Sequence, residues 1–207
     1  MTEFNDKQIE ILQVAERLFA EEGFDGASIR AIAREANVNI AMISYYFGSK
    51  EKLLEALITY RTGDMKMQLL SIFNEDLSPF QKVELLIDLY ISRINKHKCM
   101  YQIMHFELTT KKRIIEMESF MEIKRENAEI FRKIVQEGQE KGMFNKDINI
   151  DLIPTTIMGV LVHFRNNKSY FEKTMGLVTE EAFEHYIENE LTHHIKQTIK
   201  ALLAYEH

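Results

Sequence analysis

The sequence predicts an all-α protein in which a three-helix N-terminal helix-turn-helix domain precedes a C-terminal helical bundle, with about nine helices in total. Three observations lead to this prediction. Apolar residues recur every three or four positions along most of the chain, strand-like alternation is absent, and Gly (8) and Pro (2) are scarce among the 207 residues. Because 45% of the residues are hydrophobic, the chain can bury a substantial core.

The first helix is expected over about residues 6–22. Its buried stripe comprises Ile11, Val14, Ala15, Leu18 and Phe19, which are spaced three or four positions apart. Gly23 should end this helix, since glycine adopts the left-handed conformation at little cost, and Phe24 should pack back onto the helix end.

Two short helices joined by a tight turn should follow. Ser28 is a preferred N-cap residue for the first of them. The apolar stripe of that helix comprises Ile29, Ile32, Ala33 and Ala36. Asn37 lies where the chain must turn, and asparagine suits this place because it tolerates left-handed geometry. The apolar side chain of Val38 should fill the inside of the turn. The next helix should run over about residues 39–47 and end at Gly48.

A fourth helix should begin after Ser49, its N-cap, and run without a break from Lys50 to about Phe73. We expect this helix to link the two parts of the protein mechanically. The predicted division is therefore a helix-turn-helix domain, residues 1–49, and a second domain, residues 50–207.

The second domain begins its bundle with a capping box. Ser78 and Gln81 have the required types and spacing, and they should open a helix that runs to about Lys98. A short apolar segment covers residues 101–108.

Three more helices complete the predicted bundle. A long helix should run from about Arg113 to Lys141. Asp151 should cap a helix that ends near Asn166, and Thr179 should cap the last helix.

The helix over residues 39–47 divides into two faces on a helical wheel. The side that should face the core of the small domain comprises Ile40, Ile43 and Phe47. The opposite side comprises Ala41, Met42 and Tyr45, and the flank carries Asn39 and Tyr46. An outward face of this kind is typical of a helix that enters the major groove of DNA, where alanine and methionine can contact thymine methyl groups.

The charge pattern fits a small basic surface on an acidic body. The chain has a net charge of −6, whereas residues 26–53 contain four basic and two acidic side chains. Ser28 and Lys50 each lie at a helix N-terminus, where a side chain and backbone N–H groups can hold a phosphate together. Specificity should then depend on shape and base contacts.

Residues 5–53 resemble the DNA-binding domain of the TetR-like family of bacterial transcriptional regulators. The residues that carry the resemblance are Ala15, Phe19, Gly23, Phe24, Ser28, Ile29, Ile32, Ala33, Ala36, Val38, Tyr46, Phe47, Ser49, Lys50 and Leu53. The resemblance implies a homodimer that binds double-stranded operator DNA and is released by a small molecule. It implies DNA contacts at Ser28, Asn39, Ala41, Met42, Tyr45, Tyr46 and Lys50.

Three residues depart from the family pattern. Asn37 stands where the family usually has Gly, and Asn39 where it usually has Ser or Thr. Ser44 stands where many members have Tyr. Because the last two positions are contact positions, the resemblance transfers no operator sequence.

Residues 50–207 should carry ligand binding and dimerisation. The candidate dimer interface comprises Ile157, Val160, Leu161, Phe164, Phe183, Ile187, Leu191, Ile195 and Leu202. Two such helices from each subunit would form an isologous four-helix contact. The alternative is that both stripes pack within their own subunit.

Soft, adaptable side chains are concentrated in the middle helices, and the chain has 11 Met. The candidate pocket residues are Met100, Met104, His105, Phe106, Met117, Phe120, Met121, Phe131 and Met158. Such linings adapt to varied apolar ligands, so we expect a hydrophobic or aromatic effector, with ordinary core packing as the alternative. His105 and His163 are candidate polar contacts.

The sequence contains no nucleotide-binding or hydrolase motif, so we expect no enzyme and no cofactor. Its one cysteine, Cys99, allows no intrachain disulfide, and its polar N-terminus indicates a cytoplasmic protein with no membrane partner. The prediction is a homodimeric repressor that a small effector releases from a palindromic operator. A metal- or redox-responsive regulator and an interaction module that retains the helix-turn-helix as a scaffold remain alternatives, although no metal site is expected.

Overall fold

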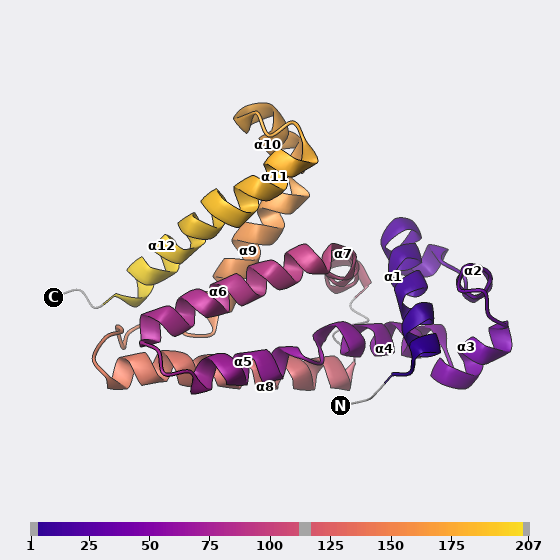
Figure 1. Cartoon of the computed structure of the whole chain (residues 1–207), viewed down its shortest axis with the longest axis horizontal. Coiled ribbons are helices and arrows are strands. Elements are labelled where there is room, and N and C mark those ends of the chain that lie inside the picture. Colours follow the sequence, from indigo (N-terminus) through magenta and orange to yellow (C-terminus); the bar gives the residue numbers. More distant parts are fainter. Residues whose placement is uncertain (1–3, 112–116, 205–207) are drawn as a thin grey trace. The chain divides into compact units, whose positions relative to one another are not determined.

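The computed structural model describes residues 4–111 and 117–204, and these residues are predominantly helical (Figure 1). Within them extended pairing is limited to one isolated bridge, between Phe144 and Ala204. The all-α prediction is therefore confirmed. The chain forms two compact units, which we name unit 1 (residues 1–66 and 96–127) and unit 2 (residues 67–95 and 128–207).

Unit 1 is built from four N-terminal helices and a fifth that comes later in the chain. These are α1 (Asp6–Gly26), α2 (Ile29–Glu35), α3 (Ile40–Phe47), α4 (Lys50–Thr62) and α7 (Lys98–Phe106), which is followed by a π-helical turn, η1 (Glu107–Lys111). Helix α7 packs against α1, so part of the chain after residue 50 belongs to the same compact unit as the helix-turn-helix. The functional boundary between residues 49 and 50 stays a prediction.

Helix α1 is fixed at both ends by local interactions. Asn5 and Gln8 form a reciprocal capping box at its N-terminus. Gly23 adopts φ 74° and ψ 163°, which interrupts the regular helix where the sequence predicted its end, and a further turn continues to Gly26. Phe24 is buried as expected, and its ring lies 5.2 Å from that of Phe19.

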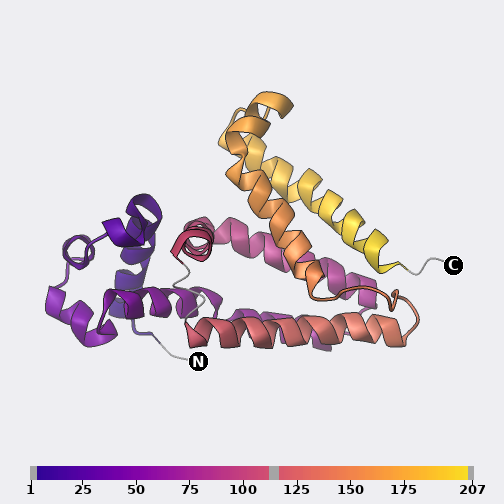
Figure 2. The same cartoon turned by 180° about the vertical axis from the view of Figure 1, so that it is seen from behind.

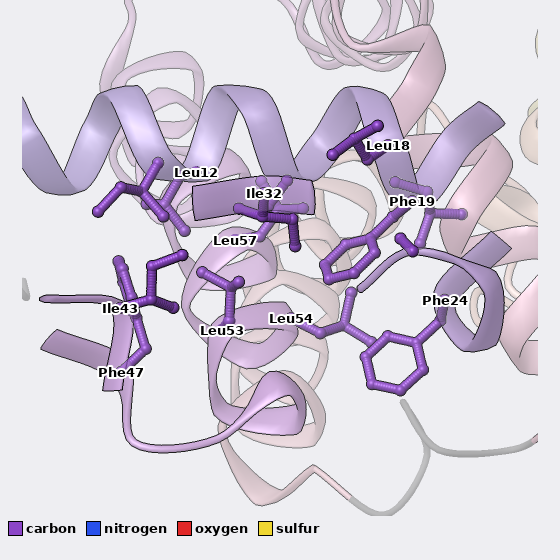
Figure 3. Close-up of a cluster of buried hydrophobic side chains, with 14 of the residues drawn as sticks. Leu12, Leu18, Phe19, Phe24, Ile32, Ile43, Phe47, Leu53, Leu54 and Leu57 are labelled. Carbon is purple, nitrogen blue, oxygen red and sulfur yellow. The ribbon is translucent and has the colours of Figure 1, made fainter. Parts of the chain in front are cut away.

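The core of unit 1 joins all four N-terminal helices (Figure 3). Side chains from α1, α2, α3 and α4 point toward one another there. The labelled members are Leu12, Leu18, Phe19, Phe24, Ile32, Ile43, Phe47, Leu53, Leu54 and Leu57, and each is buried. A partly buried ion pair adds a polar tie, because the guanidinium of Arg61 on α4 donates to the Glu16 carboxylate on α1.

Unit 2 is a helical bundle. Its helices are α5 (Met65–Asn74), α6 (Pro79–Lys96), most of α8 (Glu118–Glu140), α9 (Leu152–Asn166), α10 (Lys168–Met175), α11 (Glu180–Tyr186) and α12 (Thr192–Leu203), with a π-helical turn, η3 (Ile187–Leu191), between the last two. Helices α9 and α12 lie side by side in both views (Figure 2).

Several expected boundaries in the second half change in the structure. The unbroken fourth helix is wrong: α4 ends at Thr62 and α5 starts at Met65, because Gly63 is a poor helix former at the break. Asp151 precedes α9 as expected but makes no side-chain cap, since it accepts a hydrogen bond from Arg132 at 2.7 Å instead. Helix α10 was not expected, and the predicted helix start at Arg113 lies outside the described residues.

The other predicted caps are confirmed. Ser78 and Gln81 form the capping box, with the Ser78 N–H donating to Gln81 Oε1 at 3.0 Å. Thr179 Oγ1 accepts from the Ala182 N–H at 3.1 Å at the start of α11. These signals are short-range, so the sequence alone identifies them.

Two cations with little exposed area hold unit 2 together. Lys82 Nζ donates to the Phe73 carbonyl and to the Glu137 carboxylate, both at 2.8 Å. Hydrogen bonds from Lys141 and Lys82 hold the pKa of Glu137 below its ordinary value. Arg165 on α9 donates to both carboxylate oxygens of Glu184 on α11, at 3.0 and 2.8 Å.

Gly138 on α8 is packed closely against a side chain of unit 2. A Cβ added there would lie 2.2 Å from the ring of Phe144, which is fully buried. Gly138→Ala should therefore lower the free energy of unfolding by about 1–3 kcal/mol, through overpacking. Denaturant unfolding measures this change, and Gln136→Ala, an exposed change on the same helix, is the control. Equal stability of both variants would contradict the close packing of Phe144.

Candidate nucleic-acid interface

The turn between α2 and α3 has a defined hydrogen-bonded geometry. Asn37 adopts φ 50°, the left-handed conformation that the sequence predicted at this position. The Val38 N–H donates to the Ala33 carbonyl at 2.9 Å, and the Val38 side chain packs against the core of unit 1. The turn therefore fixes the direction in which α3 leaves α2.

Each of the three helices around the turn begins with a side-chain cap. Ser28 Oγ accepts from the Ala31 N–H at 3.0 Å at the start of α2. Asn39 Oδ1 accepts from the Ala41 N–H at 2.8 Å at the start of α3. Ser49 Oγ accepts from the Lys52 N–H at 3.1 Å at the start of α4. These caps satisfy backbone donors that would otherwise lack a partner in short helices.

Helix α3 turns one side into the core and leaves the other side open. Ile43 and Phe47 are buried, as the sequence predicted. Tyr45 is 84% exposed, and Ala41 and Ser44 are also exposed. Tyr45 therefore lies on a face of α3 that the core of unit 1 leaves uncovered.

Two assignments on this helix change in the structure. The expectation that Ile40 faces the core is wrong, because it is 42% exposed in the first turn of α3, which extends beyond the packed part of the helix. Ser44, which stands at a contact position of the family, lies on the exposed face. Met42 is half-buried and lies at the edge of that face.

Tyr46 has a different environment from its neighbour. It is half-buried and packs against the core of unit 1, and its ring centroid lies 5.4 Å from that of Tyr45 in an edge-to-face arrangement. The core therefore holds Tyr46, and Tyr46 in turn supports the exposed ring of Tyr45.

The basic side chains of this region surround α3 rather than lie on it. Arg30 and Arg34 are exposed on α2, and they form no ion pair among the described residues. Lys50 Nζ lies 4.5 Å from the centroid of the Phe24 ring, which positions it at the start of α4. Lys52 Nζ donates to the Glu55 carboxylate at 2.6 Å, and Ser119 Oγ donates to the same carboxylate. These two hydrogen bonds hold the pKa of Glu55 below its ordinary value.

The structure distributes the candidate pocket residues over both units. Those in or against the core of unit 1 are Met100, Met104, Met117 and Phe120. His105, Phe106 and Met121 are exposed, whereas Phe131 is buried and Met158 half-buried in unit 2. Their role in ligand binding stays a prediction.

The candidate dimer residues pack mainly within unit 2. Those buried in the single subunit are Ile157, Leu161, Phe164, Phe183, Ile187, Leu191 and Ile195. Val160 is half-buried, and Leu202 is exposed. The alternative of packing within the subunit thus describes most of both stripes, and the dimer interface stays a prediction.

The remaining candidates for metal or redox chemistry are Cys99 and the histidines. Cys99 is an exposed free thiol on α7. Across residues 4–111 and 117–204, no group of three or more His, Cys, Asp or Glu side chains could hold a metal ion. In the same part of the chain, no helix is long and apolar enough to cross a membrane.

A capped helix-turn-helix whose second helix presents an exposed, aromatic face defines a DNA-binding protein. Residues 11–57 match the family described as "Bacterial regulatory proteins, tetR family". Residues 79–198 match the description "Tetracyclin repressor-like, C-terminal domain", and this match covers more than half of the chain. The chain belongs to the TetR family of DNA-binding transcriptional regulators.

Known proteins similar to this chain include regulators from several bacteria. The HTH-type transcriptional repressor NicS of Pseudomonas putida is 27% identical over 168 residues, which are 76% of this chain and 75% of NicS. The transcriptional regulator FadR from Bacillus subtilis, solved in complex with stearoyl-CoA, has a TM-score of 0.73 at 18% identity, over 94% of this chain and 98% of FadR.

A second similar structure is the ketosteroid transcriptional regulator KstR2 of Mycobacterium tuberculosis. Its TM-score is 0.67 at 18% identity, over 99% of this chain and 98% of KstR2. At these identities the structural likenesses show a shared fold.

The left-handed turn residue gives a direct test of the geometry. Asn37→Gly should leave the thermal stability unchanged or slightly higher, because glycine adopts the observed φ without strain. Asn37→Ala should lower the free energy of unfolding by about 1 kcal/mol, since alanine is strained there. Thermal unfolding of the two variants measures the difference. An alanine variant as stable as the glycine variant would contradict the left-handed turn.

Proposed function

We propose that this protein is a homodimeric cytoplasmic repressor that binds a palindromic operator and is released by a small, mainly apolar effector. The exposed face of α3, with Tyr45 at its centre, is the single observation that carries the DNA-binding role. Helices α2 and α4 supply phosphate-binding groups beside it at Ser28, Arg30 and Lys50. The name of NicS, a transcriptional repressor, supports the sign of regulation.

Selection from a library of randomised DNA duplexes tests this function. Purified full-length protein should retain duplexes with two inverted half-sites about 10 bp apart, since each subunit presents one α3. Affinity should fall with rising salt in proportion to the phosphates contacted. Retention of no sequence, or of random sequences only, would favour the interaction-module alternative.

Substitution of Tyr45 tests whether the exposed face of α3 binds DNA. Tyr45→Ala should weaken binding to the selected duplex by about 1–3 kcal/mol, because the side chain lies at the centre of the exposed face. Tyr170→Ala is the matched control, since Tyr170 is also exposed but lies on α10 in unit 2. Fluorescence anisotropy measures the affinity of each variant for the selected duplex. Normal binding by Tyr45→Ala would contradict the assignment of this face.

Dimerisation is proposed through the outward faces of α9 and α12. The exposed face of α9 carries Thr155 and Gly159, which leave room for close helix approach. A Cβ added at Gly159 meets nothing within 4 Å inside the subunit, so this position is open to a partner. The exposed side of α12 contributes Ala201 and Leu202. Small and apolar residues on adjacent helices suit an isologous four-helix contact.

Gly159→Arg should shift the protein from dimer to monomer, because the new side chain would occupy the proposed interface while the subunit has space for it. Sedimentation velocity measures the change. Ser71→Arg, a small-to-large change on the exposed side of α5, is the control and should remain dimeric. A dimeric Gly159→Arg variant would place the interface elsewhere.

The apolar effector is supported by two structures of similar fold. FadR was solved with stearoyl-CoA, and KstR2 is named as a ketosteroid regulator. The methionine-rich candidate residues of this chain would suit such ligands. Stearoyl-CoA, with free CoA as control, should therefore be tested for displacement of the selected duplex. Sensitivity of binding to EDTA or to diamide instead would favour a metal- or redox-responsive regulator, the latter through exposed Cys99.

A further inference from the structure

The first turn of α3 presents an uncharged and mainly apolar surface. No residue from Ile40 to Phe47 carries a charge. Ile40 is 42% exposed, and Ala41 beside it is exposed as well. The first turn therefore leaves part of a branched aliphatic side chain in water, although burial of such a side chain is favourable.

The position of Ile40 at the start of α3 suggests a role for its exposed side chain. In helix-turn-helix proteins the N-terminal residues of the second helix contact the base edges. Arginine or lysine is the usual reader of guanine, and α3 contains neither. Asparagine reads adenine through both its amide oxygen and its amide nitrogen, and in Asn39 the Oδ1 accepts the Ala41 N–H at 2.8 Å, which leaves it one free acceptor site and ties its orientation to the helix cap.

The apolar side chains of the first turn favour one base. The hydroxyl of Ser44 can donate to or accept from several bases, so it selects weakly. The thymine C5-methyl group is the apolar feature of the major groove, and aliphatic side chains contact it. The thymine methyl group is therefore the base feature that Ile40 and Ala41 are suited to contact.

We propose that Ile40, assisted by Ala41, reads thymine methyl groups, so that each operator half-site carries A·T pairs opposite the first turn of α3. This inference rests on the proposed function and specifies the DNA chemistry that the same site selects. The basic side chains lie on α2 and α4, where Arg30, Arg34 and Lys50 serve the phosphates. Affinity and base selection are thus assigned to different helices.

Replacement of thymine by deoxyuridine tests the proposal, because it removes only the methyl group and keeps base pairing. Each thymine of the selected half-site is replaced in turn, and binding is measured by fluorescence anisotropy at fixed salt. We expect at least one position, opposite the first turn, where affinity falls about fourfold per methyl group. A scan in which every deoxyuridine duplex binds like the parent would overturn the proposal.

A double-mutant cycle connects that methyl group to Ile40. Ile40→Ala should weaken binding to the thymine duplex and should abolish the penalty at the sensitive deoxyuridine position. Met67→Ala, which also shortens an exposed apolar side chain but lies on α5, should keep the full penalty. Because Ile40 is partly exposed, the Ile40→Ala variant should unfold at nearly the same temperature as the unchanged protein. Thermal unfolding therefore checks that the variant is folded. An undiminished penalty in Ile40→Ala would assign the methyl contact to another residue and overturn the proposal.

The two hypotheses fail in different ways. Loss of the proposed function would appear as the absence of any selected, salt-dependent DNA binding. Failure of the present inference alone would appear as a selected palindrome that tolerates deoxyuridine throughout, or that carries G·C pairs at every position sensitive to Ile40→Ala.

Discussion

Burial of Ile43 and Phe47 is the interaction on which the DNA-binding surface depends. Both side chains lie in the core that α1, α2 and α4 share (Figure 3). Helix α3 is only eight residues long, so it has little stability of its own and takes its orientation from this core. Once the two side chains are buried, helical periodicity directs Tyr45 outward. The exposed face is therefore a consequence of the packing beneath it.

The ends of the short helices contribute the second constraint. A seven- or eight-residue helix leaves a large share of its backbone N–H groups without helical partners. Ser28, Asn39 and Ser49 each satisfy one such group. Asn39 combines this structural role with a position at the start of α3, and the cap uses one of the two acceptor sites of its amide oxygen. A base contact by Asn39 would therefore have to be compatible with the side-chain orientation that the cap requires.

The sequence predicts best where a structure depends on neighbouring residues. Caps such as Ser49 and Thr179 and the turn at Asn37 were predicted because their partners lie within a few positions. The wheel placed Ile40 in the core because periodicity ignores where a helix extends beyond its packing partners. Most members of the two predicted apolar stripes, on α9 and on the segment from α11 to α12, are buried within the subunit. Periodicity gives an apolar face but does not identify the surface that covers it, so the dimer interface stays a prediction.

The distribution of charge explains how an acidic protein can still select DNA. The chain carries a net charge of −6, so its overall field opposes nonspecific association with phosphates. Local cations on α2 and α4 provide attraction only where they can lie beside the backbone of the duplex. If Ile40 reads thymine as proposed, an uncharged α3 adds no electrostatic attraction to mismatched sites, and its apolar first turn gains free energy against a matching methyl group. Weak nonspecific binding and apolar readout would then act together, because each raises the ratio of specific to nonspecific affinity.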